Sequence, residues 1–191
     1  MSIHSVVIIG AQASGKMTVG QALAQQSDLI LFHNHASIDF VMQFVPDWQE
    51  ARAAIKALRF SIFQAVAQSA SHPGLIFTVL IDFADSADVG LLEEIQAIFQ
   101  QAQKDVLFVE LVTSLEERLR RNQTENRLKH KPLKRDIKWS ETDLLTSHEK
   151  FQLESVVPPK QLKHYLKIEN TELTANEVAT QIQAYLEQRR H

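Results

Sequence analysis

Short apolar runs alternate along the chain with longer stretches in which apolar residues recur at helical spacing. Five apolar runs of strand length predict strands at Ser5–Gly10, Leu29–Phe32, Leu75–Ile81, Val106–Leu111 and Tyr165–Ile168. Helical spacing is clearest in residues 47–70, in residues 88–103 and after Thr174. Strands that alternate with helices are typical of a parallel sheet built from strand–helix–strand units. We therefore expect one α/β domain that spans residues 1–191.

Two of the expected helices carry their own start signals. Ser114 is followed three residues later by Glu117, and Thr174 is followed in the same way by Glu177. In such a capping box, the hydroxyl accepts one backbone N–H bond and the carboxylate accepts another. We expect a helix to begin at each position, with its apolar stripe in the core.

Composition narrows the class of protein. The chain has 191 residues, of which 45% are hydrophobic and 23% are charged, as is ordinary for a globular domain. It has no cysteine, which excludes disulfides and thiolate metal sites and fits a reducing cytosol. No apolar stretch approaches the roughly 20 residues of a membrane span, and the first residues lack the basic start of a signal peptide. We expect a cytoplasmic protein with no membrane partner.

Positive charge is concentrated in one segment. Residues 118–138 contain nine Lys or Arg and two acids, a net charge of +7, whereas the whole chain carries −3. A basic segment in an otherwise acidic protein indicates an anionic ligand, unless these charges only pair on a solvated face. The acidic remainder argues against a nucleic-acid-binding protein.

The first predicted strand leads into a glycine-rich turn and then into a helix. The turn reads Gly10-Ala11-Gln12-Ala13-Ser14-Gly15-Lys16-Met17-Thr18, which matches the G-x-x-x-x-G-K pattern of a phosphate-binding loop. Glycines let the backbone wrap around a phosphate, and N–H groups at the helix start point toward it. Lys16 adds a cation for the β- and γ-phosphates, so we expect residues 10–18 to bind a nucleotide and Lys16 to act in catalysis.

The residue after the lysine departs from the usual pattern. A Ser or Thr is expected there, because its hydroxyl contacts Mg²⁺. The chain has Met17 instead, and a thioether is a poor ligand for so hard a cation. Thr18 and Asp82 are therefore expected to hold Mg²⁺ through water, or else metal use and turnover are weak.

Polar residues follow the second and third predicted strands, at the sheet edge where ligands of parallel sheets bind. His33-Asn34-His35 comes first, with Asp39 close behind, and these residues either contact a substrate or hydrogen-bond within their own loop. Asp82 could serve as a base or a metal partner, or only cap a turn. Arg59 interrupts an apolar helical stretch, so it either binds an anionic group of the substrate or is an ordinary surface arginine.

The basic segment 118–138 is expected to form a lid over the phosphates. Arg118 and Arg121 are three residues apart on the helix that begins at Ser114, so they are expected to share a face. Together with Arg127 they could clamp a transferring phosphoryl group and stabilise its charge.

These features resemble the small P-loop kinases of the shikimate kinase, gluconate kinase and nucleoside monophosphate kinase type. The resemblance covers most of the chain, from residues 10–19 through Arg59 and the basic segment to residues 168–173. It implies a P-loop three-layer α/β/α sandwich, with a five-stranded parallel sheet in the order 2-3-1-4-5. It also implies ATP with Mg²⁺ as the phosphoryl donor, and an adenine that lies between Arg118 and the pair Asn170 and Thr171.

Some phrases are similar to a narrower bacterial subgroup that is labelled shikimate-kinase-like or AAA-family ATPase. They are G-K-M-T-V, Phe-His-Asn-His and Arg-Asn-Gln-Thr-Glu-Asn-Arg-Leu. Shikimate kinases, however, carry Asp-x-Asp where this chain has His33-Asn34-His35, and a Gly-Gly turn where it has Asp82-Phe83-Ala84. Because these changes fall in the acceptor pocket, the resemblance implies the use of ATP but not of shikimate.

The sequence thus predicts an ATP-dependent phosphotransferase that acts on a small hydroxyl-bearing molecule. A nucleoside monophosphate kinase is the nearest alternative. A non-catalytic ATP-binding regulatory protein is the other, and Met17 favours it. The identity of the acceptor and the oligomeric state are open at this point.

Overall fold

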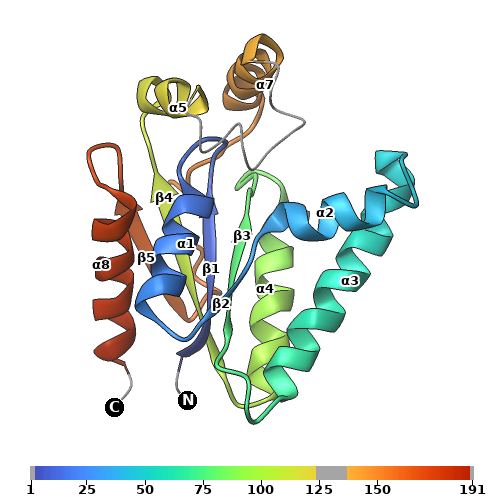
Figure 1. Ribbon diagram of the computed structural model, residues 1–191, viewed down its shortest axis with the longest axis vertical. Coiled ribbons are helices and arrows are strands. Elements are labelled where there is room, and N and C mark those ends of the chain that lie inside the picture. The colour runs from blue at the N-terminus through green and yellow to red at the C-terminus, as the bar shows by residue number, and fades with distance from the viewer. Residues whose placement is uncertain (1–2, 124–136, 190–191) are drawn as a thin grey trace.

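A five-stranded parallel sheet forms the centre of the protein in a computed structural model that describes residues 3–123 and 137–189 (Figure 1). Its strands are β1 (Ile3–Gly10), β2 (Ile30–Phe32), β3 (Leu75–Val79), β4 (Asp105–Val112) and β5 (His164–Glu169). They pair in the order β2-β3-β1-β4-β5. The predicted fold is confirmed. Arg127 and most of the predicted lid lie outside the described residues.

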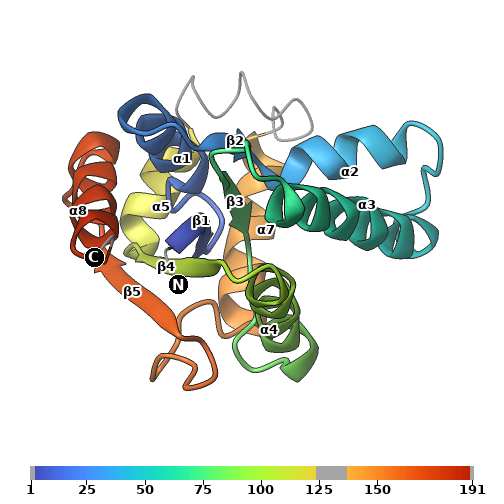
Figure 2. The same cartoon turned by 90° about the horizontal axis from the view of Figure 1, so that it is seen from below.

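Helices cover both faces of the sheet. They are α1 (Lys16–Gln26), α2 (Asn34–Met42), α3 (Trp48–Gln68), α4 (Ser86–Gln101), α5 (Leu115–Asn122), α7 (Ile137–Lys150) and α8 (Ala175–Glu187). Helices α1 and α8 pack on one face, α3 and α4 pack on the other, and α5 and α7 lie beyond the carboxyl ends of the strands (Figures 1 and 2). Among the described residues, no helix is both long and apolar enough to cross a membrane.

Helix α2 was not expected, because Asn34 and His35 were placed in a loop and instead form its first turn. No side chain caps the start of this helix, so the sequence holds no start signal there. Tertiary packing stabilises the helix instead. Val41 packs with Ala51 and Ile55 of α3 in a small core of its own.

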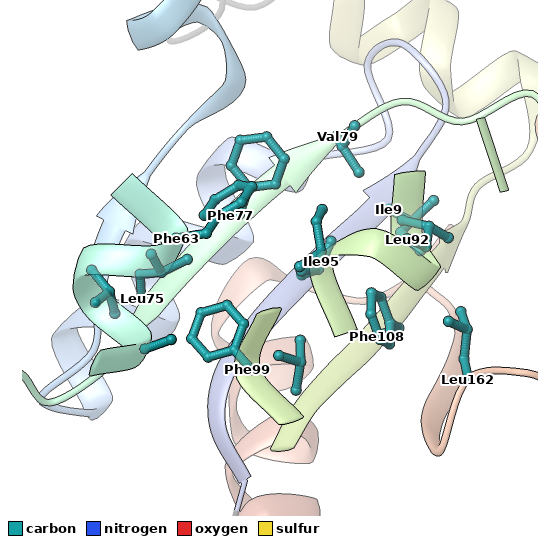
Figure 3. Packing of buried hydrophobic residues seen from close by; sticks show 14 of the residues in the cluster. Ile9, Phe63, Leu75, Phe77, Val79, Leu92, Ile95, Phe99, Phe108 and Leu162 are labelled. Carbon is teal, nitrogen blue, oxygen red and sulfur yellow. The ribbon is translucent and has the colours of Figure 1, made fainter. Parts of the chain in front are cut away.

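Successive residues of the central strand β1 supply two different cores. Val7 and Ile9 face α3 and α4, where they pack with aromatic residues that include Phe63, Phe77 and Phe99 (Figure 3). Val6 and Ile8 face α1 and α8. A parallel strand that is buried on both faces is a continuous apolar run, which explains why the sequence pattern located it correctly.

One of the two predicted capping boxes is complete. Thr174 Oγ1 accepts from the backbone N–H of Glu177 at 3.3 Å, and Glu177 Oε2 accepts from that of Thr174 at 2.8 Å. At Ser114 only the hydroxyl takes part, accepting from Glu117 N at 3.2 Å. The backbone N–H of Ser114 donates instead to Thr171 Oγ1 at 2.9 Å, which joins the start of α5 to the segment after β5.

The segment that follows α7 is fixed to the sheet through the buried carboxylate of Glu110 on β4. Glu110 Oε1 accepts from the backbone N–H of Ser155 at 2.8 Å, and Oε2 accepts from the Tyr165 hydroxyl at 2.6 Å. Lys167 Nζ lies 3.3 Å from Oε1 and supplies the opposite charge. Burial and this carboxylate raise the pKa of Tyr165, so its hydroxyl remains a hydrogen-bond donor.

Candidate nucleotide-binding site

The phosphate loop joins β1 to α1 and contains two residues with left-handed backbone. Gly15, directly before α1, has φ 92°, a conformation that favours glycine. Ala13 has φ 60°, although left-handed backbone costs a residue with a Cβ about 1–2 kcal/mol. Such strain persists only where the surroundings impose it, so contacts around the loop must hold its shape.

Three side chains hold the loop from outside, and they converge on the Ser14 carbonyl. Asn170 Nδ2 donates to it at 3.0 Å, and Arg121 Nη1 donates at 3.2 Å. The Thr113 hydroxyl lies 3.4 Å from the same oxygen and 2.6 Å from Asn170 Oδ1. Asn170 was predicted to bind the nucleotide, and at 1% exposure it also anchors the phosphate loop.

Lys16 bends back into its own loop. Its ammonium donates to the carbonyl of Gly10 at 2.6 Å and to that of Ala11 at 2.7 Å. A phosphate chain on the loop N–H groups would offer charged acceptors to the same ammonium, and bonds between two charged groups are the stronger ones. The lysine is thus close to where a nucleotide would need it.

A cavity of about 620 Å³ lies beside the loop. Residues 13–19 form one wall, Glu117, Arg120 and Arg121 of α5 form a second, and residues 170–175 form the third. Its volume is that of a typical small-molecule pocket. The fold therefore brings the predicted nucleotide-binding residues Ser14 to Thr18, Asn170 and Thr171 to one place.

Glu117 organises the basic wall of this cavity. Its carboxylate accepts two bonds from Arg120, at 2.6 and 2.7 Å, and one from Arg121 Nε at 2.6 Å. Hydrogen bonds from Arg120 and then Arg121 lower the pKa of Glu117 to about 2. Sequence reasoning missed Glu117 and Arg120 as site residues, although the three- and four-residue spacing of acid and arginines on one helix was a readable signal.

Arg121 connects three parts of the site. Besides its bonds to Glu117 and Ser14, its Nη2 donates to the carbonyl of Asn170 at 2.9 Å and to that of Thr171 at 3.0 Å. The guanidinium therefore joins α5 to the phosphate loop and to the segment after β5. These bonds show that Arg121 holds the parts of the site together. Its role as a phosphoryl clamp stays a prediction.

Arg118 contacts α7 and is not part of the cavity walls. Its guanidinium is 1% exposed, and Nη2 lies 3.0 Å from His148 Nδ1. Nε and Nη1 have no hydrogen-bond partner, and burial lowers the pKa of this arginine. Arg118 and Arg121 therefore have different partners, since Arg118 contacts α7 whereas Arg121 contacts the phosphate loop. Arg118 is also not among the residues that line the cavity where an adenine would fit.

The predicted substrate residues gather at the carboxyl ends of β2 and β3. Thr78 Oγ1 accepts from the backbone N–H of Asn34 at 3.1 Å. Arg59 donates to Ser37 Oγ at 2.7 Å and to the Asn34 carbonyl at 3.4 Å. Burial lowers the pKa of Arg59 to about 10, and no acid in residues 3–123 or 137–189 forms an ion pair with it.

His33 and His35 enter the same region from the start of α2. His33 precedes the helix as its N-cap residue and is partly buried. His35 Nδ1 lies 3.8 Å from Asp39 Oδ1, one helical turn further on. A carboxylate beside one ring nitrogen favours the proton on that nitrogen, which leaves the other nitrogen to accept one.

Asp82 lies in a turn. Its Oδ1 accepts from the backbone N–H groups of Ala84 and Gln152, both at 3.0 Å. The Gln152 carbonyl in turn accepts from Phe83 N at 2.8 Å. These contacts tie the end of α7 to the end of β3, which favours the turn role over the base role for Asp82.

The donor set around the loop does not form a protein-built metal cage. Within the described part of the chain, no group of three His, Cys, Asp or Glu side chains could hold a metal ion. Met17 lines the cavity and Thr18 follows it. These residues fit an Mg²⁺ ion that is held mainly by phosphate oxygens and water.

Solved structures with the same fold cover almost the whole chain. A protein from Chloroflexus aurantiacus J-10-fl, provisionally assigned as a kinase, is 17% identical with a TM-score of 0.66, and 98% of each chain is covered. A gluconokinase from Sinorhizobium meliloti 1021 is 17% identical with a TM-score of 0.60, covering 98% of this chain and 94% of its own. A shikimate kinase from Acinetobacter baumannii, solved with shikimate, is 16% identical with a TM-score of 0.54, covering 99% and 96%.

In sequence, no protein-family model and no curated protein matches the chain. The structural similarities therefore establish the fold alone, which the chain shares with these solved structures.

Proposed function

We propose that the protein is an ATP-dependent phosphotransferase that moves the γ-phosphoryl group of ATP to a small acceptor with a hydroxyl group. The cavity that runs from the phosphate loop to residues 170–175 is the observation that carries this proposal. A nucleotide needs a phosphate cradle that is continuous with space for a nucleoside, and this cavity offers both. The kinase fold of the structural neighbours supports the same reading.

The base of the nucleotide would lie between Arg120 and residues 171–175. The Arg120 guanidinium lines the cavity, and its bidentate pair with Glu117 fixes the plane of the group. A guanidinium of fixed plane stacks well on an aromatic ring. Arg120 therefore takes the role that the sequence resemblance implied for Arg118.

Lys16 and Arg118 would act on the transferring phosphoryl group. Lys16 would leave the carbonyls of its own loop for the β- and γ-phosphate oxygens. Arg118 Nε and Nη1, buried and without partners, are suited to an anion and would stabilise charge in the transition state. Mg²⁺, held through phosphate oxygens, water and Thr18, would neutralise part of the phosphate charge.

The acceptor would bind at the carboxyl ends of β2 and β3. Arg59 would bind an anionic group of the acceptor, since it is a partly buried cation with which no acid in the described part of the chain forms an ion pair. His33 and Asn34 would bind its polar groups. The acceptor oxygen would attack the γ-phosphorus, the bond from that phosphorus to the bridging β-phosphate oxygen would break, and ADP would leave. His35, with Asp39 beside it, would take the hydroxyl proton.

The experiment is the release of ADP from Mg·ATP across a panel of acceptors. The panel holds sugars, sugar acids, shikimate, nucleosides, nucleoside monophosphates and aminoglycosides. Lys16→Ala is the blank, and we expect it to weaken ATP binding by about 1.5–3 kcal/mol, the scale of a charged hydrogen bond. Lys160→Ala, which removes an exposed lysine outside the cavity, is the matched control and should behave as wild type.

Each outcome separates the candidate functions. One acceptor that raises ADP release well above the blank establishes the kinase and its substrate class. Stimulation by nucleoside monophosphates alone makes the protein a nucleoside monophosphate kinase. ATP binding that Lys16→Ala weakens, without stimulation by any acceptor, favours a regulatory protein over an enzyme.

A further inference from the structure

Two nitrogens of a buried arginine side chain have no partner. The Arg118 guanidinium is 1% exposed, and neither Nε nor Nη1 makes a hydrogen bond. Asn122 lies one turn further along α5, is equally buried, and has an Nδ2 group that also lacks a partner. Its Oδ1 accepts a hydrogen bond from the Ser140 hydroxyl of α7, at 2.9 Å. These unsatisfied groups are all donors, so they are suited to an anion.

These donors lie on a helix that is hydrogen-bonded to the phosphate loop. Arg121 ties α5 to the Ser14 carbonyl, and α5 and α7 both lie beyond the carboxyl ends of the strands (Figure 1). An anion there would be the phosphoryl group at the far end of a nucleotide bound to the loop. That role for Arg118 is part of the proposed function, and the inference below rests on it.

Within residues 3–123 and 137–189, the Arg118 guanidinium bonds to a histidine on the last turn of α7. Arg118 Nη2 lies 3.0 Å from His148 Nδ1. A guanidinium has donors only, so Nδ1 must carry a lone pair and the imidazole must be neutral with its proton on Nε2. Glu154 adds a favourable electrostatic interaction without a hydrogen bond to Nε or Nη1.

His148 is itself held in place by the segment that follows it. The backbone N–H of Gln152 donates to Asp82 Oδ1 at 3.0 Å, and its carbonyl accepts from Phe83 N at 2.8 Å. Ser155 N donates to Glu110 Oε1 at 2.8 Å. The end of α7 is therefore fixed to β3 and β4, and it presents the imidazole from a rigid part of the fold.

We propose that His148 is a positioning residue for phosphoryl transfer. By accepting from Nη2, it orients the Arg118 guanidinium and leaves Nε and Nη1 for the γ-phosphoryl group. The imidazole does not contact the nucleotide. Its effect is specific to ligands that have a γ-phosphate, because only that group meets Arg118.

Calorimetric titration with Mg·ADP and with Mg·AMP-PNP, an ATP analogue that is not hydrolysed, tests this. We expect His148→Leu to weaken AMP-PNP binding roughly tenfold or more, the effect of one charged hydrogen bond, and to leave ADP binding within about twofold. His148→Asn should retain wild-type affinity for both, since its amide oxygen reaches about as far as Nδ1. Arg118→Leu should show the same selective loss, and the double variant should lose no more than either single variant.

The controls separate this inference from the proposed function. Glu149→Gln changes the next exposed residue and should bind both ligands as wild type does. His148 is also exposed, so its variants should fold. An unchanged ratio of the two affinities in His148→Leu, or a loss in His148→Asn equal to that in His148→Leu, overturns the positioning role alone. Failure of wild type to bind either ligand overturns the proposed function and this inference with it.

Discussion

Glu117 shows how one side chain can serve stability and the binding site together. Its carboxylate fixes the plane of Arg120 at the cavity wall and holds Arg121, which joins α5 to the phosphate loop. The same arginines depress its pKa to about 2. A depressed pKa means that the charged form of this carboxylate is more stable in the folded protein than in the unfolded chain.

We therefore expect the contribution of Glu117 to stability to depend on pH. It is complete above the ordinary pKa of 4.5 and is lost as the pH falls toward about 2. Urea unfolding of wild type and Glu117→Gln should differ by a constant amount at pH 5 and above, and the difference should shrink at pH 3. A difference that is the same at pH 3 and pH 7 would contradict the assigned pKa.

At the scale of elements, a buried carboxylate connects β4, β5 and the segment after α7. Glu110 is fully buried, and its partners come from Ser155, Tyr165 and Lys167. Removing one member of a buried charged network leaves the others unsatisfied, which is costly. Glu110 should therefore hold the segment after α7 more firmly than its irregular backbone would suggest.

We expect Glu110→Ala to lower the free energy of unfolding by about 3–5 kcal/mol. Tyr165→Phe keeps the ring and removes one bond to the carboxylate, so it should cost only about 1.5–3 kcal/mol. In both variants, amide hydrogen exchange in residues 151–157 should be faster than in wild type, while exchange in α8 should not change. Unchanged exchange in residues 151–157 would show that other contacts hold the segment.

At the scale of the whole molecule, two glycines have opposite surroundings, so the same substitution by alanine should have opposite effects on stability. Gly74 has φ 110°, and a Cβ there would lie 1.8 Å from the His4 carbonyl oxygen of β1. Its own carbonyl accepts from Ile30 N of β2, so this turn joins β1, β2 and β3. Gly90 lies within α4, where a Cβ would meet nothing within 4 Å.

We expect Gly74→Ala to destabilise the fold by about 2–4 kcal/mol, because it combines backbone strain with a clash against fixed backbone. Gly90→Ala should stabilise it by about 0.5–1 kcal/mol, since alanine is the better helix former. Denaturant unfolding of the two variants measures both values. Effects of the same sign would contradict this account of the two sites.

The sequence predicted the fold well because its strongest patterns belong to buried elements. β1, β3 and β4 each contain a run of buried apolar residues, and the phosphate loop has a distinctive sequence. It did not predict α2, which depends on packing against α3 and has no capping side chain. Nor did it predict the link from Arg118 to His148, since residues 30 apart in the chain meet only through the tertiary fold.

The position of Lys16 has a kinetic consequence. Its ammonium is already bound to two carbonyls of its own loop, at 2.6 and 2.7 Å. These carbonyls compete with an incoming phosphate for the ammonium group. A nucleoside without phosphates could enter the cavity and leave these bonds intact, whereas a nucleotide must exchange them for its own oxygens. Association would then have two stages, a rapid encounter in the cavity and a slower release of the lysine. The number of phosphates on the ligand would govern the second stage.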